Sequence, residues 1–317
     1  MKKIFLIYFF VICILFFLSF KFLFTKQNAF INSPLPNFLT LFKNGQVSTL
    51  NIWLPDFNNR ENGRIKTPEV SARSALIYDL TTNKVMFDKN AKEKLPMASL
   101  TKIMTSVVAL ENQKKDDKYK VTKKDLIGED SMGLSQGEVL SLKELLYGLI
   151  LNSGNDAAET LANNFPGGRT KFIEAMNKKA KTLGLTDTNF TNPTGLEGDG
   201  KQYTTAYDLL VITRYAILNF PLLNEVVSTF DYNIPKTKTH KVYILENETN
   251  LLTSYPGVKG VKTGYTPEAG FCLVTYLDYG GHKIIGILLG SDNRRQEMKE
   301  LLDYSLRFLG VEPPVHE

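Results

Sequence analysis

The chain has 317 residues, of which 43% are apolar and 22% are charged, and its formal net charge is +5. These values are typical of a globular protein with a sizeable core, and nothing in them resembles a nucleic-acid-binding module. Two cysteines, Cys13 and Cys272, exclude a disulfide framework, and three histidines without ligand-like spacing argue against a zinc enzyme. We therefore expect no metal and no other cofactor. The lysine surplus is interpreted as solvated surface, with a basic face toward an anionic wall or lipid as the alternative.

The amino-terminal segment is strongly apolar. Two lysines precede a run from Ile4 to Phe20, which continues past Lys21 to Phe24. About 20 apolar residues span a bilayer as a helix. Because no small-residue cleavage site follows, we favour an uncleaved transmembrane anchor over residues 1–24 rather than a cleaved signal. Either alternative exports the remainder, so we expect the chain at the cell membrane with its main domain on the extracytoplasmic side.

Residues 25–66 show no regular period and contain several prolines, so they are predicted to form an irregular linker. A single domain is expected over residues 67–312, followed by a short tail over 313–317. It should begin with a β-hairpin, because the β-type runs 74–80 and 84–88 flank a short turn.

Helical periodicity begins at Ser99 and dominates the middle of the domain. Ser141 with Glu144 forms a capping box for one helix, and Asn155 or Asp156 is expected to cap the next. A further helix is predicted from about residue 170 to Gly184. Thr205 and Asp208 suggest a second capping box.

Strand patterns return after about residue 219, with predicted strands at 257–265, 271–279 and 282–289. Gly280 and Gly281 form a tight hairpin turn between the last two. An amphipathic helix is expected over 294–309, with Gly310 behind it. Strands at both ends that enclose a helical middle predict an α+β fold, in which helices and an inserted helical lobe pack on one antiparallel sheet.

The run Ser99-Leu-Thr-Lys102 places a hydroxyl and an amine one turn apart at a helix start. Residues three apart share a helix face, so Lys102 reaches the Ser99 hydroxyl. Serine is a poor nucleophile until a base takes its proton, and a lysine serves as base only when it is neutral. Burial and a nearby positive charge from Lys262 favour the neutral amine. Alone, this pattern is also an ordinary capped helix start.

Ser153-Gly-Asn155 occupies a predicted turn between two helices. Ser153 is a candidate proton relay, and the Asn155 amide can bond both Lys102 and a substrate backbone. In isolation these residues are equally typical of simple turns.

Lys262-Thr-Gly264 lies in a predicted strand, along which a peptide can pair through main-chain bonds. Gly264 permits close approach, Thr263 can bond a terminal carboxylate, and Lys262 adds positive charge. The main-chain N–H groups of Tyr265 and Ser99 are the candidate oxyanion donors. The alternative is a plain strand that contains a glycine bulge.

Together and in this order, the three motifs match the set that penicillin-binding proteins and serine β-lactamases share. From about residue 73 to 309 the chain resembles the low-molecular-mass penicillin-binding proteins, which are serine-type D-Ala-D-Ala carboxypeptidases of the peptidase S11 kind. The resemblance extends over four stretches longer than the motifs: Tyr78 to Val85, Leu95 to Thr105, Asn152 to Glu159 and Gly257 to Gly270.

The resemblance implies a β-lactamase/transpeptidase-like fold and an acyl-enzyme on Ser99. Its implied substrate is a peptidoglycan pentapeptide that loses its terminal D-Ala, and β-lactams are implied covalent inhibitors. It also suggests that Arg294 helps fix the substrate carboxylate, although Arg295 is adjacent. Two departures stand out: the expected tether is at the amino end, and Thr194 occupies a position where histidine is frequent.

The sequence leaves three alternatives open. A class A β-lactamase shares the fold but needs a loop carboxylate for deacylation, for which Glu197 is the available residue. A Ser-His-Asp hydrolase lacks a credible histidine, since His240 reads as a loop or edge residue. A wall-binding protein without enzymatic activity can keep the same pocket, because fold alone does not establish activity.

Overall fold

The computed structural model describes residues 53–57 and 66–316. The predicted anchor over 1–24 lies outside this part of the chain, as does most of the predicted linker, and both stay predictions. Within the described residues, no single helix combines the length and hydropathy that a membrane span needs. Two consecutive helices, α6 and α7 (Ala206–Asn219 and Pro221–Val227), meet both criteria only as a pair, and they are bent by 110° at their junction.

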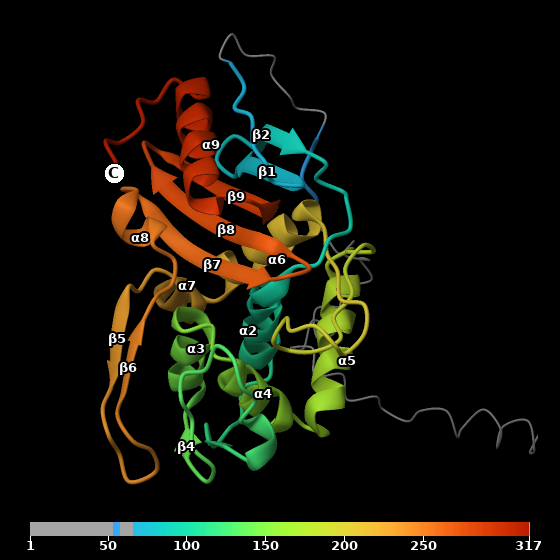
Figure 1. Cartoon of the computed structure of the whole chain (residues 1–317), viewed down its shortest axis with the longest axis vertical. Coiled ribbons are helices and arrows are strands. Elements are labelled where there is room, and N and C mark those ends of the chain that lie inside the picture. Colours follow the sequence, from blue (N-terminus) through green and yellow to red (C-terminus); the bar gives the residue numbers. More distant parts are fainter. Residues whose placement is uncertain (1–52, 58–65, 317) are drawn as a thin grey trace, which may run out of the picture. The chain divides into compact units, whose positions relative to one another are not determined.

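A five-stranded antiparallel sheet forms the centre of the domain, with strand order β2-β1-β9-β8-β7. The register pairs Ile77 with Gly286 and Lys262 with Val274. The sheet thus joins two amino-terminal strands to three carboxy-terminal ones, as the sequence predicts (Figure 1). Its strands are β1 (Ser74–Asp79), β2 (Lys84–Lys89), β7 (Val258–Thr266), β8 (Gly270–Tyr279) and β9 (His282–Ser291).

Alternating side chains give the sheet two apolar faces. In β1, Leu76 and Tyr78 belong to the core shared with the helical lobe, whereas Ala75 and Ile77 belong to a second core on the other face. The second core is completed by α9 (Arg294–Phe308), which crosses that face of the sheet (Figure 1). The sheet is therefore buried on both sides, and its edge at β7 faces the lobe.

The helical lobe surrounds α2 (Thr101–Glu111), in which nine of the eleven residues are buried. Its other long helices are α3 (Leu142–Leu151), α4 (Asn155–Asn163), α5 (Gly168–Thr182) and α6. Short elements complete it: the 3-10 turns η2 (Ala98–Leu100) and η3 (Lys123–Asp125), and the strand pair β3 (Tyr119–Lys120) and β4 (Val139–Leu140). The predicted capping box of Ser141 and Glu144 is present at the start of α3.

Two predicted caps are wrong in detail. Gly154 is the N-cap of α4, and Asn155 and Asp156 lie inside its first turn. The Asp156 carboxylate instead accepts main-chain N–H groups from Met132 and Leu134, at 3.0 and 2.8 Å, which holds the loop before β4 against α4. Thr205 does cap α6, but the Asp208 carboxylate accepts from the Thr188 hydroxyl instead of closing a box.

The segment after α6 is more varied than the predicted return to strands. It contains α7, the hairpin of β5 (Asp231–Ile234) and β6 (Tyr243–Glu246), and the short helix α8 (Leu251–Ser254), before β7 begins. The β5–β6 hairpin runs alongside the lobe (Figure 1). His240 lies in its loop as predicted, yet it is buried, with Nε2 3.2 Å from the Glu144 carboxylate.

Candidate active site

Ser99 lies in the 3-10 turn η2, immediately before α2. Ala98, directly before it, has φ of 48°, a left-handed conformation that costs a non-glycine residue about 1–2 kcal/mol. Such strain persists only where the surrounding structure holds it. Here η2 packs between β7 on one side and the loop that contains Gly195 on the other. The hydroxyl is thus presented at the open end of a buried helix.

Lys102 is fully buried one turn further along α2. Its Nζ lies 2.8 Å from Ser99 Oγ, 2.7 Å from Asn155 Oδ1 and 2.9 Å from the carbonyl oxygen of Thr194. Burial, and then the positive charge of Lys262, hold the pKa of Lys102 well below its usual value. A neutral amine has two donors and one lone pair, so it can donate to Asn155 and Thr194 and accept the Ser99 proton.

Ser153 and Asn155 come from the turn between α3 and α4. Ser153 is 1% exposed and also has a left-handed backbone, with φ of 53°. Asn155 bonds Lys102 as predicted, but its Nδ2 donates to the carbonyl of Glu129 at 3.1 Å. Its main-chain N–H donates to the carbonyl of Asp130 at 2.7 Å, so this asparagine also fastens the neighbouring loop to the site.

The third motif lies on β7, which is the edge strand of the sheet nearest η2. A Cβ added at Gly264 would lie 3.1 Å from the Ser99 nitrogen, so the strand and the helix start are in contact there. Lys262 is 1% exposed, and burial lowers its pKa to about 8. The Thr263 hydroxyl donates to Glu248 Oε2 at 3.3 Å.

Tyr265 and Arg294 occupy the outer part of the site. The Tyr265 side chain is 55% exposed and its ring lies 4.8 Å from that of Phe271. Arg294 begins α9, and one of its guanidinium nitrogens donates to the carbonyls of Gly264 and Cys272 at 2.7 and 3.3 Å. Arg295 is exposed, so of the two arginines only Arg294 supports the motif strand.

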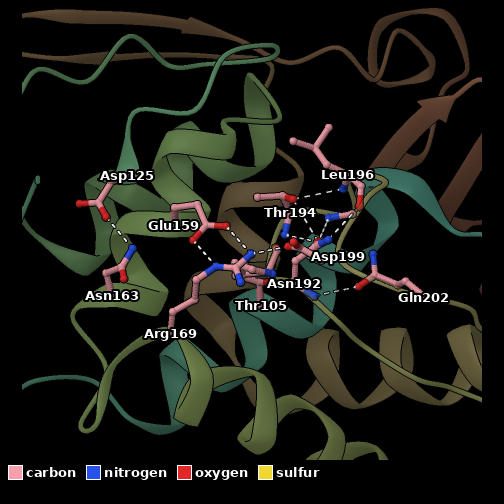
Figure 2. Close-up of polar contacts among 12 residues, drawn as sticks. Thr105, Asp125, Glu159, Asn163, Arg169, Asn192, Thr194, Leu196, Asp199 and Gln202 are labelled. Carbon is pink, nitrogen blue, oxygen red and sulfur yellow. Dashed lines mark hydrogen bonds and ion pairs between the residues drawn. The ribbon is translucent and has the colours of Figure 1, made fainter. Parts of the chain in front are cut away.

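A buried turn over residues 192–196 completes the surroundings of Lys102. The Asn192 carboxamide oxygen accepts from the N–H groups of Thr194 and Gly195 at 3.2 and 2.7 Å, and its Nδ2 donates to the Leu196 carbonyl at 2.8 Å. These contacts are drawn in Figure 2. The turn therefore aims the Thr194 carbonyl at Lys102. The sequence carries no signal for this partner, because every residue has a main-chain carbonyl.

A charged network tethers the loop that follows this turn. The Arg169 guanidinium joins Glu159 of α4, at 2.8 Å, to Asp199, at 2.7 Å (Figure 2). Glu159 is 5% exposed in its side chain, and burial raises its pKa even though the arginine opposes the shift. The bidentate contact from Arg169 compensates for the burial of this carboxylate.

A cavity of about 490 Å³ adjoins the site between this turn, the loop before β4 and the end of β7. It is lined by Ile127, Gly128, Glu129, Leu196, Glu197, Thr266 and Pro267. Glu197 Oε1 accepts from the main-chain N–H of Glu268 at 3.0 Å. The described residues contain no group of acidic, histidine or cysteine side chains that could hold a metal ion.

We predict that replacing Asn192 by alanine destabilises the protein and weakens the hold on Lys102. The change leaves two buried N–H groups, the Thr194 hydroxyl and one carbonyl without their Asn192 partner, and each such loss costs about 1–3 kcal/mol. Urea denaturation should show the lower free energy of unfolding. Asn164→Ala is the control, because this half-buried asparagine makes similar bonds to the main chain of Lys120 at positions that solvent can reach. Water can replace those bonds, so Asn164→Ala should cost less; an equal cost for both variants would contradict the importance of the buried Asn192 contacts.

Comparisons with known proteins agree with this geometry. Residues 61–293 match the Peptidase_S11 family, described as D-alanyl-D-alanine carboxypeptidase. The chain is 36% identical over 258 residues to D-alanyl-D-alanine carboxypeptidase DacF of Bacillus subtilis, an alignment that covers 78% of this chain and 65% of the relative. It is 35% identical over 268 residues to DacC of Escherichia coli, covering 79% and 65%. The chain thus spans slightly less than two thirds of the length of these curated relatives.

Solved structures show the same fold. The Streptomyces K15 DD-transpeptidase matches with a TM-score of 0.72 and 32% identity, covering 77% of this chain and all of that one. Penicillin-binding protein D2 from Listeria monocytogenes, in a cefotaxime-bound form, matches with a TM-score of 0.68 and 29% identity over 76% of this chain and all of the other. The matches in sequence and fold lead to one conclusion: the chain belongs to the Peptidase S11 family.

Proposed function

We propose that the chain is a serine D-Ala-D-Ala carboxypeptidase that removes the terminal D-Ala from peptidoglycan stem peptides through an acyl-enzyme on Ser99. The observation that carries the proposal is the 2.8 Å contact between Lys102 Nζ and Ser99 Oγ, made by a fully buried amine whose pKa is depressed. A neutral amine at this distance can take the serine proton.

In the proposed reaction, Lys102 accepts the Ser99 proton while Oγ attacks the carbonyl carbon of the penultimate D-Ala. The N–H groups of Ser99 and Tyr265 stabilise the oxyanion, and Ser153 passes a proton to the leaving amine. The C–N bond breaks, D-Ala departs, and water then hydrolyses the ester. The substrate backbone pairs along the β7 edge, with its carboxylate toward Lys262 and Thr263 and its acyl portion in the adjoining cavity.

The test measures free D-alanine released from a stem pentapeptide, with Ser99→Ala as the inactive control. Mass spectrometry should also find a long-lived covalent adduct of penicillin on the wild-type protein and none on the variant. Cleavage of cross-linked peptides without D-alanine release would favour an endopeptidase, and rapid turnover of penicillin would favour a β-lactamase. A noncovalent signal that persists in Ser99→Ala would instead favour a wall-binding protein.

The pH dependence of kcat/KM is expected to be bell-shaped. Activity should rise as Lys102 loses its proton on the acidic side, because only the neutral amine is a base. It should fall as pH passes about 8, where Lys262 loses the charge that holds the substrate carboxylate. Lys262→Arg keeps a charge throughout this range, so its basic limb should move to higher pH; an unchanged basic limb would assign it to another group.

We also propose that the apolar segment 1–24 anchors the chain in the bacterial membrane, with the catalytic domain on the extracytoplasmic side. The support is the uninterrupted run from Ile4 to Phe20 and the lysines before it. Fractionation should find the full chain in membranes after alkaline carbonate washing, and external protease should degrade it in spheroplasts. Recovery of a processed chain in the soluble fraction would show a cleaved signal instead.

A further inference from the structure

A carboxylate of the protein itself occupies the part of the site that faces β7. Glu248 lies between β6 and α8, and its Oε2 accepts the Thr263 hydroxyl at 3.3 Å. Its main chain is fixed on both sides: its N–H donates to the Leu151 carbonyl at 3.2 Å, and its carbonyl accepts from Asn250 at 3.0 Å. The side chain is exposed, so solvent and substrate can reach it.

Glu248 acts electrostatically on three basic side chains of the site. Its negative charge raises the pKa of Lys102, Lys262 and Arg294, although burial has the larger and opposite effect on each. The negative charge of Asp130 also raises the pKa of both lysines, whereas the positive charge of Arg294 lowers the pKa of Lys262. Of these three side chains, Lys262 is the one that the proposed function assigns to the carboxylate of the substrate.

One hydroxyl proton can be donated to only one acceptor at a time. The terminal carboxylate of a stem peptide has the same chemistry as the Glu248 side chain, and it needs the same hydroxyl. We propose that Glu248 is a specificity-determining residue that holds Thr263 in the free protein and is exchanged for the terminal carboxylate of the substrate. The inference rests on the proposed function. It means that Glu248 and the substrate carboxylate compete for the Thr263 hydroxyl.

Neutralising Glu248 should have two effects of opposite sign. Removing a like charge favours the binding of a carboxylate, as long as Lys262 is protonated. The same change removes a group that raises the Lys262 pKa, so that pKa falls below about 8. The gain in affinity should therefore be largest in mildly acidic to neutral solution and shrink as pH rises through 8.

The experiment compares wild type, Glu248→Gln and the matched control Glu246→Gln, an exposed carboxylate on β6. We expect Glu248→Gln to lower KM for the pentapeptide about three- to tenfold at pH 6.5, with kcat within about twofold, since like charges near a binding site mainly affect affinity. The ratio of the wild-type KM to the Glu248→Gln KM should fall toward one above pH 8. Glu246→Gln should behave as wild type throughout.

Penicillin and its methyl ester separate this inference from the proposed carboxypeptidase activity, because both report acylation of Ser99 and only one carries a carboxylate. At a pH where Lys102 is already neutral in both proteins, Glu248→Gln should speed acylation by penicillin, relative to wild type, about three- to tenfold, and leave the rate with the ester unchanged. The inference would be overturned if wild type and Glu248→Gln reacted with penicillin at equal rates, or if the variant gained equally with both compounds. In either case, the adduct itself would still support Ser99 as the nucleophile. Absence of any adduct on wild type would overturn the proposed function and the inference with it.

Discussion

Replacing Lys102 by methionine is expected to slow acylation by penicillin about 10²–10⁴-fold, the range over which a positioned general base contributes. Methionine keeps most of the volume of the buried side chain and removes the only amine within hydrogen-bond distance of Ser99 Oγ among the described contacts. The Asn155 and Thr194 oxygens also lose their donor, so some stability should be lost. Stopped-flow measurement of acylation, together with thermal unfolding, separates the two effects.

Lys179→Met is the matched control for this prediction. Lys179 is another buried lysine, on α5, and its Nζ lies 2.5 Å from Glu111, outside the site. Its loss leaves the partly buried Glu111 carboxylate with the Tyr215 hydroxyl as its remaining side-chain partner among the described residues. This should cost stability without changing acylation. If folded Lys102→Met were acylated within tenfold of wild type, the base would have to be a different group.

Replacing Gly195 by alanine should both destabilise the protein and slow acylation. Gly195 has φ of +94°, and a Cβ there would lie 2.0 Å from the carbonyl oxygen of Ala98 and 2.9 Å from the nitrogen of Ser99. Both neighbours are backbone atoms, so the turn and the start of α2 must separate. We expect backbone strain of about 1–2 kcal/mol and a further 1–3 kcal/mol for overpacking, with Ser99 displaced from Lys102.

Gly198→Ala isolates the cost of the contact with Ala98. Gly198 has a similar φ of +108°, but nothing lies within 4 Å of its added Cβ. This variant should therefore show only the backbone strain in urea denaturation, and its acylation rate should match that of wild type. Equal losses of stability and activity in the two variants would contradict the importance of the close approach between the turn and η2.

Local regularities in the sequence were sufficient for much of the fold. Nearly continuous apolar runs define strands at both ends of the domain, and the helical period after Ser99 places Lys102 on the same face as the serine. Both features depend on residues that are near in sequence, so the hairpin of β1 and β2, the helix α2 and the capping box of α3 were predicted correctly. The antiparallel sheet then follows because short turns join β1 to β2 and β8 to β9, and strands joined by a tight turn pair antiparallel.

Sequence reasoning failed where a short polar residue had several partners to choose from. Asp156 was expected to cap its own helix, but it bonds the N–H groups of a loop more than twenty positions earlier. Asp208 likewise bonds Thr188 instead of closing a local box. Local and distant partners of a carboxylate have similar energies, so only the packing of the chain selects between them.

What the sequence determined by itself is the set of reactive groups, the helix that holds Ser99 beside Lys102, and the strand that presents Lys262. Tertiary structure alone decided what surrounds them. The Thr194 carbonyl bonds Lys102 although the two residues are 92 positions apart in the chain, and Glu248 bonds Thr263 from the loop between β6 and α8. The physical reason is that a lysine loses its charge only by burial among particular neighbours, and burial is a property of the packed molecule.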